Sequence, residues 1–123
     1  MRFLLILAAL SLTLMGCPPG CGEPESIGAC GTKNPVEDIA WLKAEVDAVK
    51  NNTSIIADYS VMQAVYKGAT VFWISICCPT CDTVPPTARY CDGSIAGQFL
   101  ISIQESEISN SKVIWATKNG VCR

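Results

Sequence analysis

Eight of the 123 residues are cysteine and none is histidine. In a chain of about one domain, this many thiols cross-link the fold, bind metal or carry redox chemistry, and the compartment decides which. The missing histidine excludes Ser-His-Asp and Cys-His catalysis and removes the commonest metal ligand. The formal charge of −2 leaves no broad basic face, so we expect no nucleic-acid partner.

The N-terminal segment indicates the compartment. Arg2 precedes an apolar stretch of 13 residues, Phe3–Met15, broken only by Ser11 and Thr13. A helix that spans a membrane needs about 20 residues, so this stretch is too short. A short apolar run behind a basic start and ahead of a small residue predicts a secretory signal over residues 1–16. Its removal leaves a chain of 107 residues with a small net negative charge, in an oxidising compartment.

The end of this signal carries a second motif. Leu14-Met15-Gly16-Cys17 resembles the lipobox of bacterial lipoproteins. The resemblance implies cleavage after Gly16, a diacylglyceryl thioether on Cys17, and a further acyl group such as palmitate on the new amino terminus. Several acyl chains, at about 0.8 kcal/mol per buried methylene, would hold a domain at the membrane almost permanently. The alternative is an ordinary signal whose Cys17 joins a disulfide.

The residue after the proposed anchor bears on localisation. Pro18 stands where lipoproteins retained in the inner membrane carry aspartate. The resemblance therefore implies the bacterial outer membrane, with the domain facing the periplasm or the cell surface.

The mature chain divides into a tether and a domain. Residues 17–33 are rich in proline and glycine and lack apolar periodicity, which predicts a lipidated Cys17 and a flexible tether. Residues 34–123 are expected to form a single α+β domain. Cys21 and Cys30 lie in the tether, so a disulfide from either to the domain would pin the tether down.

A helix is predicted at the start of this domain. Asn34 is a suitable N-cap, Pro35 fits the first helical position, and Glu37 can complete a capping box. Apolar residues then recur at spacings of three and four until Asn51, and Trp41 lies on the flank of this stripe, at the edge of the core. The apolar positions are Val36, Ile39, Leu42, Val46 and Val49.

Beyond Ser54 the pattern changes to strands, because β-branched and aromatic residues alternate with turn residues. Lys67-Gly68-Ala69 fits a hairpin connection. The strand candidates are 60–66, 70–77, 88–91, 98–104 and 112–118, with a polar stretch over 105–111. The predicted fold class is α+β, with one N-terminal amphipathic helix packed on a small antiparallel sheet of about four strands.

The second strand candidate has two distinct faces. Phe72, Ile74 and Ile76 share one face, and this face is expected to meet the helix. The opposite face carries Val71, Trp73 and Ser75.

Several motifs over residues 34–118 together resemble a group of small bacterial lipoproteins built around a domain of unknown function. Its helix-plus-sheet shape is similar to PepSY-like and β-lactamase-inhibitor-like folds. This resemblance implies a shape and no catalytic residues. The matching motifs are Asn34–Asp38, Trp41-Leu42-Lys43, Tyr66-Lys67-Gly68, Cys77-Cys78, Tyr90-Cys91-Asp92-Gly93 and Val113-Ile114-Trp115.

With Cys17 lipidated, seven cysteines remain, so at least one thiol stays unpaired. Adjacent Cys77 and Cys78 would point to opposite faces of a strand and take different partners. We expect one of these two to pair with Cys91, and Cys122 to pair with the tether. The disulfide candidates are Cys21, Cys30, Cys77, Cys78, Cys81, Cys91 and Cys122.

Cys78-Pro79-Thr80-Cys81 resembles the C-P-x-C active site of glutaredoxins. In such enzymes a helix N-terminus lowers the pKa of the attacking thiol. Here Pro85 and Pro86 follow closely, a sequence that does not begin a helix, so structural cross-linking is favoured. A four-cysteine zinc site lacks a clear second pair, and we expect neither metal nor cofactor.

The sequence therefore predicts a lipid-anchored, non-enzymatic module of the bacterial cell envelope. Its domain would present a face or loop to another envelope protein. One alternative is a periplasmic thiol-disulfide exchange protein that uses Cys78 and Cys81. Another is an inhibitor of a secreted enzyme, which rests on the fold resemblance alone.

Overall fold

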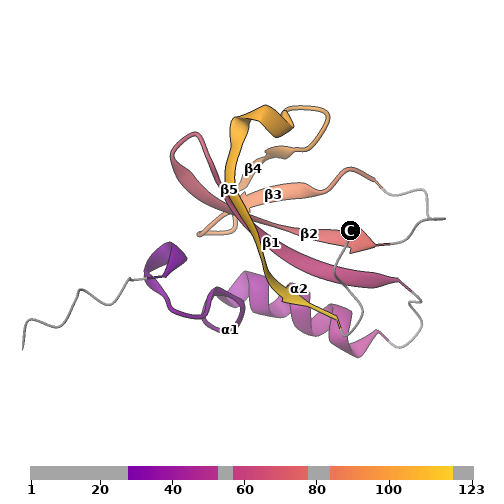
Figure 1. The fold of residues 1–123 in the computed structure, drawn as a ribbon. Coiled ribbons are helices and arrows are strands. Elements are labelled where there is room, and N and C mark those ends of the chain that lie inside the picture. The colour runs from indigo at the N-terminus through magenta and orange to yellow at the C-terminus, as the bar shows by residue number, and fades with distance from the viewer. Residues whose placement is uncertain (1–27, 53–56, 78–83, 118–123) are drawn as a thin grey trace, which may run out of the picture.

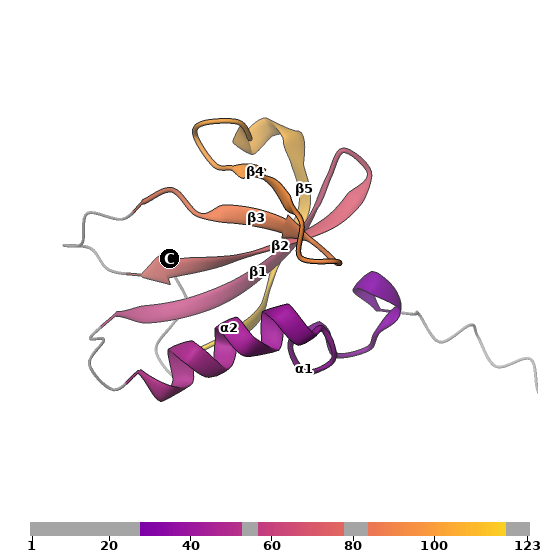
Figure 2. The same cartoon turned by 180° about the vertical axis from the view of Figure 1, so that it is seen from behind.

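A computed structural model of the protein describes residues 28–52, 57–77 and 84–117. A helix precedes an antiparallel sheet with strand order β4-β3-β2-β1-β5, so the mixed α+β class is confirmed, and the sheet has five strands rather than about four. Figures 1 and 2 show α2 along one face of the sheet and η2 on the other side. The elements are η1 (Ala29–Gly31), α1 (Pro35–Asp38), α2 (Ala40–Asn51), β1 (Asp58–Tyr66), β2 (Ala69–Cys77), β3 (Thr87–Tyr90), β4 (Ile95–Gln98), η2 (Glu105–Glu107) and β5 (Ile108–Ala116).

The predicted helix is divided in two. Ile39 has extended backbone angles and separates the single turn α1 from the twelve-residue α2. The predicted capping box is wrong, because the Asn34 side chain makes no capping hydrogen bond. The Thr32 hydroxyl instead accepts a hydrogen bond from the Asn34 backbone N–H and donates one to the Asp38 carboxylate. Glu37 is thereby left to pair with Lys43.

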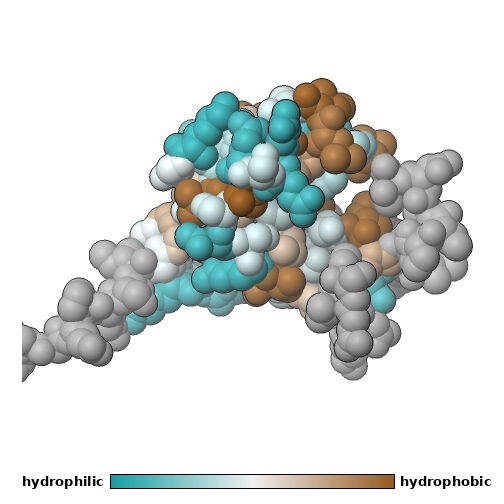
Figure 3. Space-filling model, turned by 45° about the horizontal axis from the view of Figure 1, so that its top comes forward, coloured by the Kyte–Doolittle hydropathy of each residue, from teal (hydrophilic) through white to brown (hydrophobic). Residues whose placement is uncertain are grey.

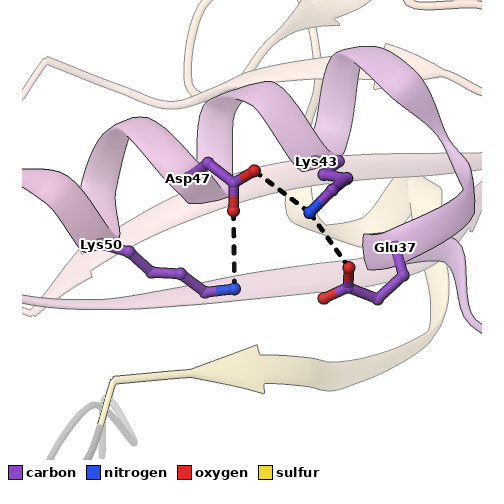
Figure 4. A network of polar contacts seen from close by, with 4 residues as sticks. All are labelled: Glu37, Lys43, Asp47 and Lys50. Atoms are coloured by element: carbon purple, nitrogen blue, oxygen red, sulfur yellow. Dashed lines mark hydrogen bonds and ion pairs between the residues drawn. The ribbon is translucent and has the colours of Figure 1, made fainter.

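The exposed side of the helix carries a network of charges (Figure 4). Lys43 Nζ lies 3.1 Å from a carboxylate oxygen of Glu37 and 3.1 Å from one of Asp47, and Lys50 Nζ lies 3.6 Å from Asp47. The hydrogen bonds to Glu37 and Asp47 raise the pKa of Lys43, and the bond from Lys43 lowers the pKa of Asp47. Because these side chains are exposed, the network adds little to stability.

The buried side of the helix forms the first core. Leu42 and Val46 pack with Val61 of β1 and Phe72 of β2, as the apolar stripe predicts. Ile74 packs against the same cluster, which confirms that this face of β2 meets the helix. Ile76 lies further along the strand and is 42% exposed.

The opposite face of the sheet carries a second core that the sequence did not predict. It contains Ala64, Tyr66, Val71, Ala88 and Ile103. Because both faces of the central strands are covered, β1 and β2 lie in a middle layer.

The predicted strand over 98–104 is wrong. β4 ends at Gln98, and the chain turns back so that the Leu100 N–H donates to the Ile103 carbonyl at 3.1 Å. The Ser102 hydroxyl accepts a hydrogen bond from the Gln98 N–H at 2.8 Å. Such local side-chain bonds compete with a sheet ladder, which explains why the strand stops here.

The last strand begins earlier than predicted. β5 starts at Ile108 and includes most of the polar stretch that we expected to be a loop. Its register with β1 shifts between Gln63 and Val65, and Asn110 has a positive φ of 53°. β5 is an edge strand, so its polar residues face water, and a bulge of this kind protects such an edge.

Candidate functional site

The described disulfide joins Cys30 to Cys91, with their Cα atoms 5.7 Å apart. The predicted pairing of Cys91 with Cys77 or Cys78 is therefore wrong. Cys91 follows Tyr90, which lies opposite Val71, and Cys77 is six residues further along β2, roughly 20 Å away. A disulfide needs a Cα separation of about 4.4–6.8 Å, so this register excludes a Cys77–Cys91 bond. Cys77 is itself disulfide-bonded.

Five cysteines of interest lie outside the described residues. Three predictions concern these residues and stay predictions. They are the lipidation of Cys17, the cross-linking role of the C-P-x-C motif, and the disulfide between Cys122 and the tether. Within the described ranges no helix is long and apolar enough to cross a membrane, and no three potential metal ligands gather. The five are Cys17, Cys21, Cys78, Cys81 and Cys122.

The side chain of Trp41 holds the turn that carries the Cys30–Cys91 bond. Trp41 Nε1 donates a hydrogen bond to the Cys91 carbonyl at 3.1 Å, and its ring packs edge-on against Phe72. The Arg89 guanidinium lies 5.8 Å from the Trp41 ring and donates to the Gly93 carbonyl. Gly93 has a φ of 86°, and a Cβ there would come 3.0 Å from the Trp41 ring. Trp41 therefore clamps the turn after β3, in line with its predicted place at the core edge.

This turn yields a prediction about Asp92. The hydroxyl and the backbone N–H of Ser94 both donate to the Asp92 carboxylate, at 2.6 and 2.9 Å, and lower the pKa of Asp92. A depressed pKa in the folded state stabilises the fold above the ordinary pKa of aspartate, and this contribution is lost as pH falls through the lowered value. In Ser94→Ala, an NMR titration should show the Asp92 pKa rising toward its ordinary value. The Asp47 pKa, which depends on Lys43, should stay in place, and an unchanged Asp92 titration would contradict the assignment.

An apolar site lies on the face of the sheet opposite α2. We call it the apolar groove; its volume is about 410 Å³. The rings of Trp73 and Phe99 meet with centroids 4.7 Å apart and form its aromatic wall. Glu105 is the one charged residue among the described residues that line it. The lining residues are Trp73, Pro86, Phe99, Leu100, Glu105, Ile108 and Ser111.

The loop that borders the groove exposes two large apolar side chains. Leu100 is 88% exposed and Ile101 is 72% exposed. In Figure 3, hydrophobic atoms gather at the upper right, over the end of the molecule where β4 and η2 lie. Leu100 also has a φ of 63°, a left-handed conformation that is strained for a side chain of this size.

The loop is nonetheless held in one conformation. The Gln98 carbonyl accepts hydrogen bonds from the N–H groups of Ile101, Ser102 and Ile103, at 3.3, 2.9 and 3.1 Å. The Ile103 side chain is buried in the second core. The exposure of Leu100 and Ile101 is therefore built into the fold, which is typical of an interaction site.

Sequence reasoning missed this site. The prediction placed Phe99–Ile103 in a strand, although Phe99-Leu100-Ile101 are consecutive apolar residues and do not alternate. That run breaks the alternation of a half-buried strand, and it is the one local signal against the predicted strand. The contribution of Trp73 to the same groove depends on the tertiary fold and has no local signal.

The fold and the site together define a small α+β domain. A disulfide fixes the turn after β3, and an apolar groove lies on the face of the sheet that α2 does not cover. No protein family, curated protein or solved structure matches the chain. The resemblance to small bacterial lipoproteins therefore rests on the sequence motifs alone.

Proposed function

We propose that this chain is a lipid-anchored protein of the bacterial cell envelope that acts by binding another envelope protein. The anchor would be Cys17, in the outer membrane, and its support is the lipobox-like sequence that ends there. Thirteen residue steps separate Cys17 from Cys30. Even fully extended, they span at most roughly 45 Å, and the Cys30–Cys91 bond fixes their far end to the domain. The domain would thus work close to the membrane surface.

The observation that carries the binding role is the hydrogen-bonded loop that holds Leu100 and Ile101 in water beside the apolar groove. Burying such side chains on a partner is favourable, at about 25 cal/mol per Å² of apolar surface. The chemistry of the groove supports binding rather than catalysis. Apart from the Glu105 carboxylate and the Ser111 hydroxyl, its described lining offers no side-chain acid, base or nucleophile.

Globomycin, which blocks the lipoprotein signal peptidase, tests the anchor. In treated cells the precursor that retains residues 1–16 should accumulate, because cleavage before a lipidated cysteine needs that enzyme. A secreted protein with an ordinary signal peptide, followed in the same cells, should mature normally. Normal maturation of this chain under globomycin would contradict the anchor.

Thiol trapping separates binding from disulfide exchange. In an exchange protein, Cys81→Ala would leave Cys78 unable to resolve its mixed disulfides, so other proteins would be captured covalently. We expect no such capture that depends on Cys78. Adducts that form with Cys81→Ala and vanish when Cys78→Ala is added would replace the binding proposal with the exchange function.

A further inference from the structure

The apolar groove is shaped before any partner arrives. Trp73, Phe99 and Ile108 are partly buried, and all three pack against the second core. Its volume of about 410 Å³ is enough for one or two large side chains of a partner. A rigid wall of this kind favours binding, because no side chain of the wall has to be ordered on contact.

The charge on the rim of the groove restricts the partner further. Glu105 is exposed, and none of the described lysine or arginine side chains lines the groove or pairs with it. Glu107, in the same turn, accepts a hydrogen bond from the Gln104 N–H at 2.8 Å. The pKa of Lys67 is raised by a hydrogen bond with Tyr66 and also by the nearby charge of Glu107. Glu105 therefore supplies the negative charge of the rim. The complement to this rim is a cation next to an apolar group.

We propose that the apolar groove binds a segment of an envelope protein in which a large apolar side chain lies beside a lysine or arginine. The apolar side chain would rest against Trp73 and Phe99 and contact Leu100, and the cation would pair with Glu105. This inference rests on the proposed binding function and specifies the chemistry of the partner.

The charge of Glu105 argues against two other occupants. Bacterial membranes carry anionic lipids, and their headgroups would be repelled by the Glu105 carboxylate. A second copy of this chain, docked about a two-fold axis through the groove, would place both Glu105 carboxylates at the rim of one small interface. Like charges facing each other across an interface disfavour association.

Peptide selection with a charge swap tests the inference. The probe is a random dodecapeptide library displayed on phage. The library is panned on protein that is purified from cells expressing the full-length sequence. If this protein is membrane-bound, it is first reconstituted in lipid nanodiscs. The wild-type protein should enrich peptides with a large apolar residue next to lysine or arginine. Glu105→Lys should instead enrich the apolar residue next to aspartate or glutamate.

Affinity measurements on one enriched synthetic peptide complete the test. Glu105→Lys and Leu100→Asp should each weaken its binding by about tenfold or more. Glu37→Lys, an exposed charge swap on the helix side of the molecule, is the matched control and should leave binding unchanged. Circular dichroism should show that all three variants remain folded.

Three kinds of result would overturn the inference. One is the absence of a shared motif, or an affinity that Glu105→Lys leaves unchanged. Another is a dimer that Leu100→Asp dissociates, which would make the occupant a second copy. The third is Leu100-dependent binding to vesicles of phosphatidylethanolamine and phosphatidylglycerol. The anchor and the groove can fail independently. An unlipidated protein that still selects the motif of an apolar residue beside lysine or arginine would contradict the lipidation of Cys17 and would support the assignment of the groove.

Discussion

Replacing Leu42 by alanine is expected to lower the free energy of unfolding by about 3–5 kcal/mol. Leu42 is 0% exposed and packs with Val46, Val61 and Phe72 where α2 meets the sheet. The substitution removes buried methyl groups and leaves a cavity that these neighbours fill only in part. Because small domains are stable by only about 5–15 kcal/mol, the loss would be a large fraction of the total. Urea denaturation followed by tryptophan fluorescence measures it.

Leu100→Ala is the matched control, since it deletes the same atoms from a side chain that is 88% exposed. Its effect should stay within about 0.5 kcal/mol of zero. Equal losses from the two substitutions would contradict the assignment of Leu42 to the core and Leu100 to the surface.

Removing the Cys30–Cys91 bond is expected to cost about 4 kcal/mol. The two cysteines are 61 residues apart, and a cross-link over that distance restricts the unfolded chain strongly. The double variant Cys30→Ala, Cys91→Ala is preferable to a single one, because a lone thiol could exchange with another disulfide. Denaturation of wild type and double variant under non-reducing conditions gives the difference.

The control for this prediction is the same comparison in a reducing buffer. Reduction opens the Cys30–Cys91 bond of the wild type, and the variant has no such bond. The difference in free energy of unfolding between the two proteins should therefore fall below about 1 kcal/mol. A difference that persists in reductant would mean that the alanines act through lost packing beside Trp41 and not through the cross-link.

The parts of the fold that were predictable from sequence depend on local periodicity. The apolar stripe of the helix identified Leu42 and Val46 as core residues. The hairpin between β1 and β2 was also predictable, since Lys67 and Gly68 form its turn with positive φ angles of 48° and 80°. Paired positive φ angles suit the tight turns that join twisted strands.

The parts that were not predictable depend on competition between local and tertiary interactions. The expected capping box did not form, because the Asn34 N–H that Glu37 would have bonded donates to the Thr32 hydroxyl instead. The register of β3 against β2 excludes Cys77 as the partner of Cys91, and the sequence does not show that register. The groove likewise needs Trp73 of β2 and Phe99 beyond β4 to meet, although they are far apart along the chain.

The proposed membrane anchor depends most on the chemical state of Cys17. Mass spectrometry of the mature, non-reduced protein measures it directly. We expect a polypeptide that begins at Cys17 and carries a diacylglyceryl group and an amide-linked acyl chain, together with a cross-linked peptide that contains Cys30 and Cys91. An unmodified thiol or a cystine at Cys17 would contradict the membrane anchor.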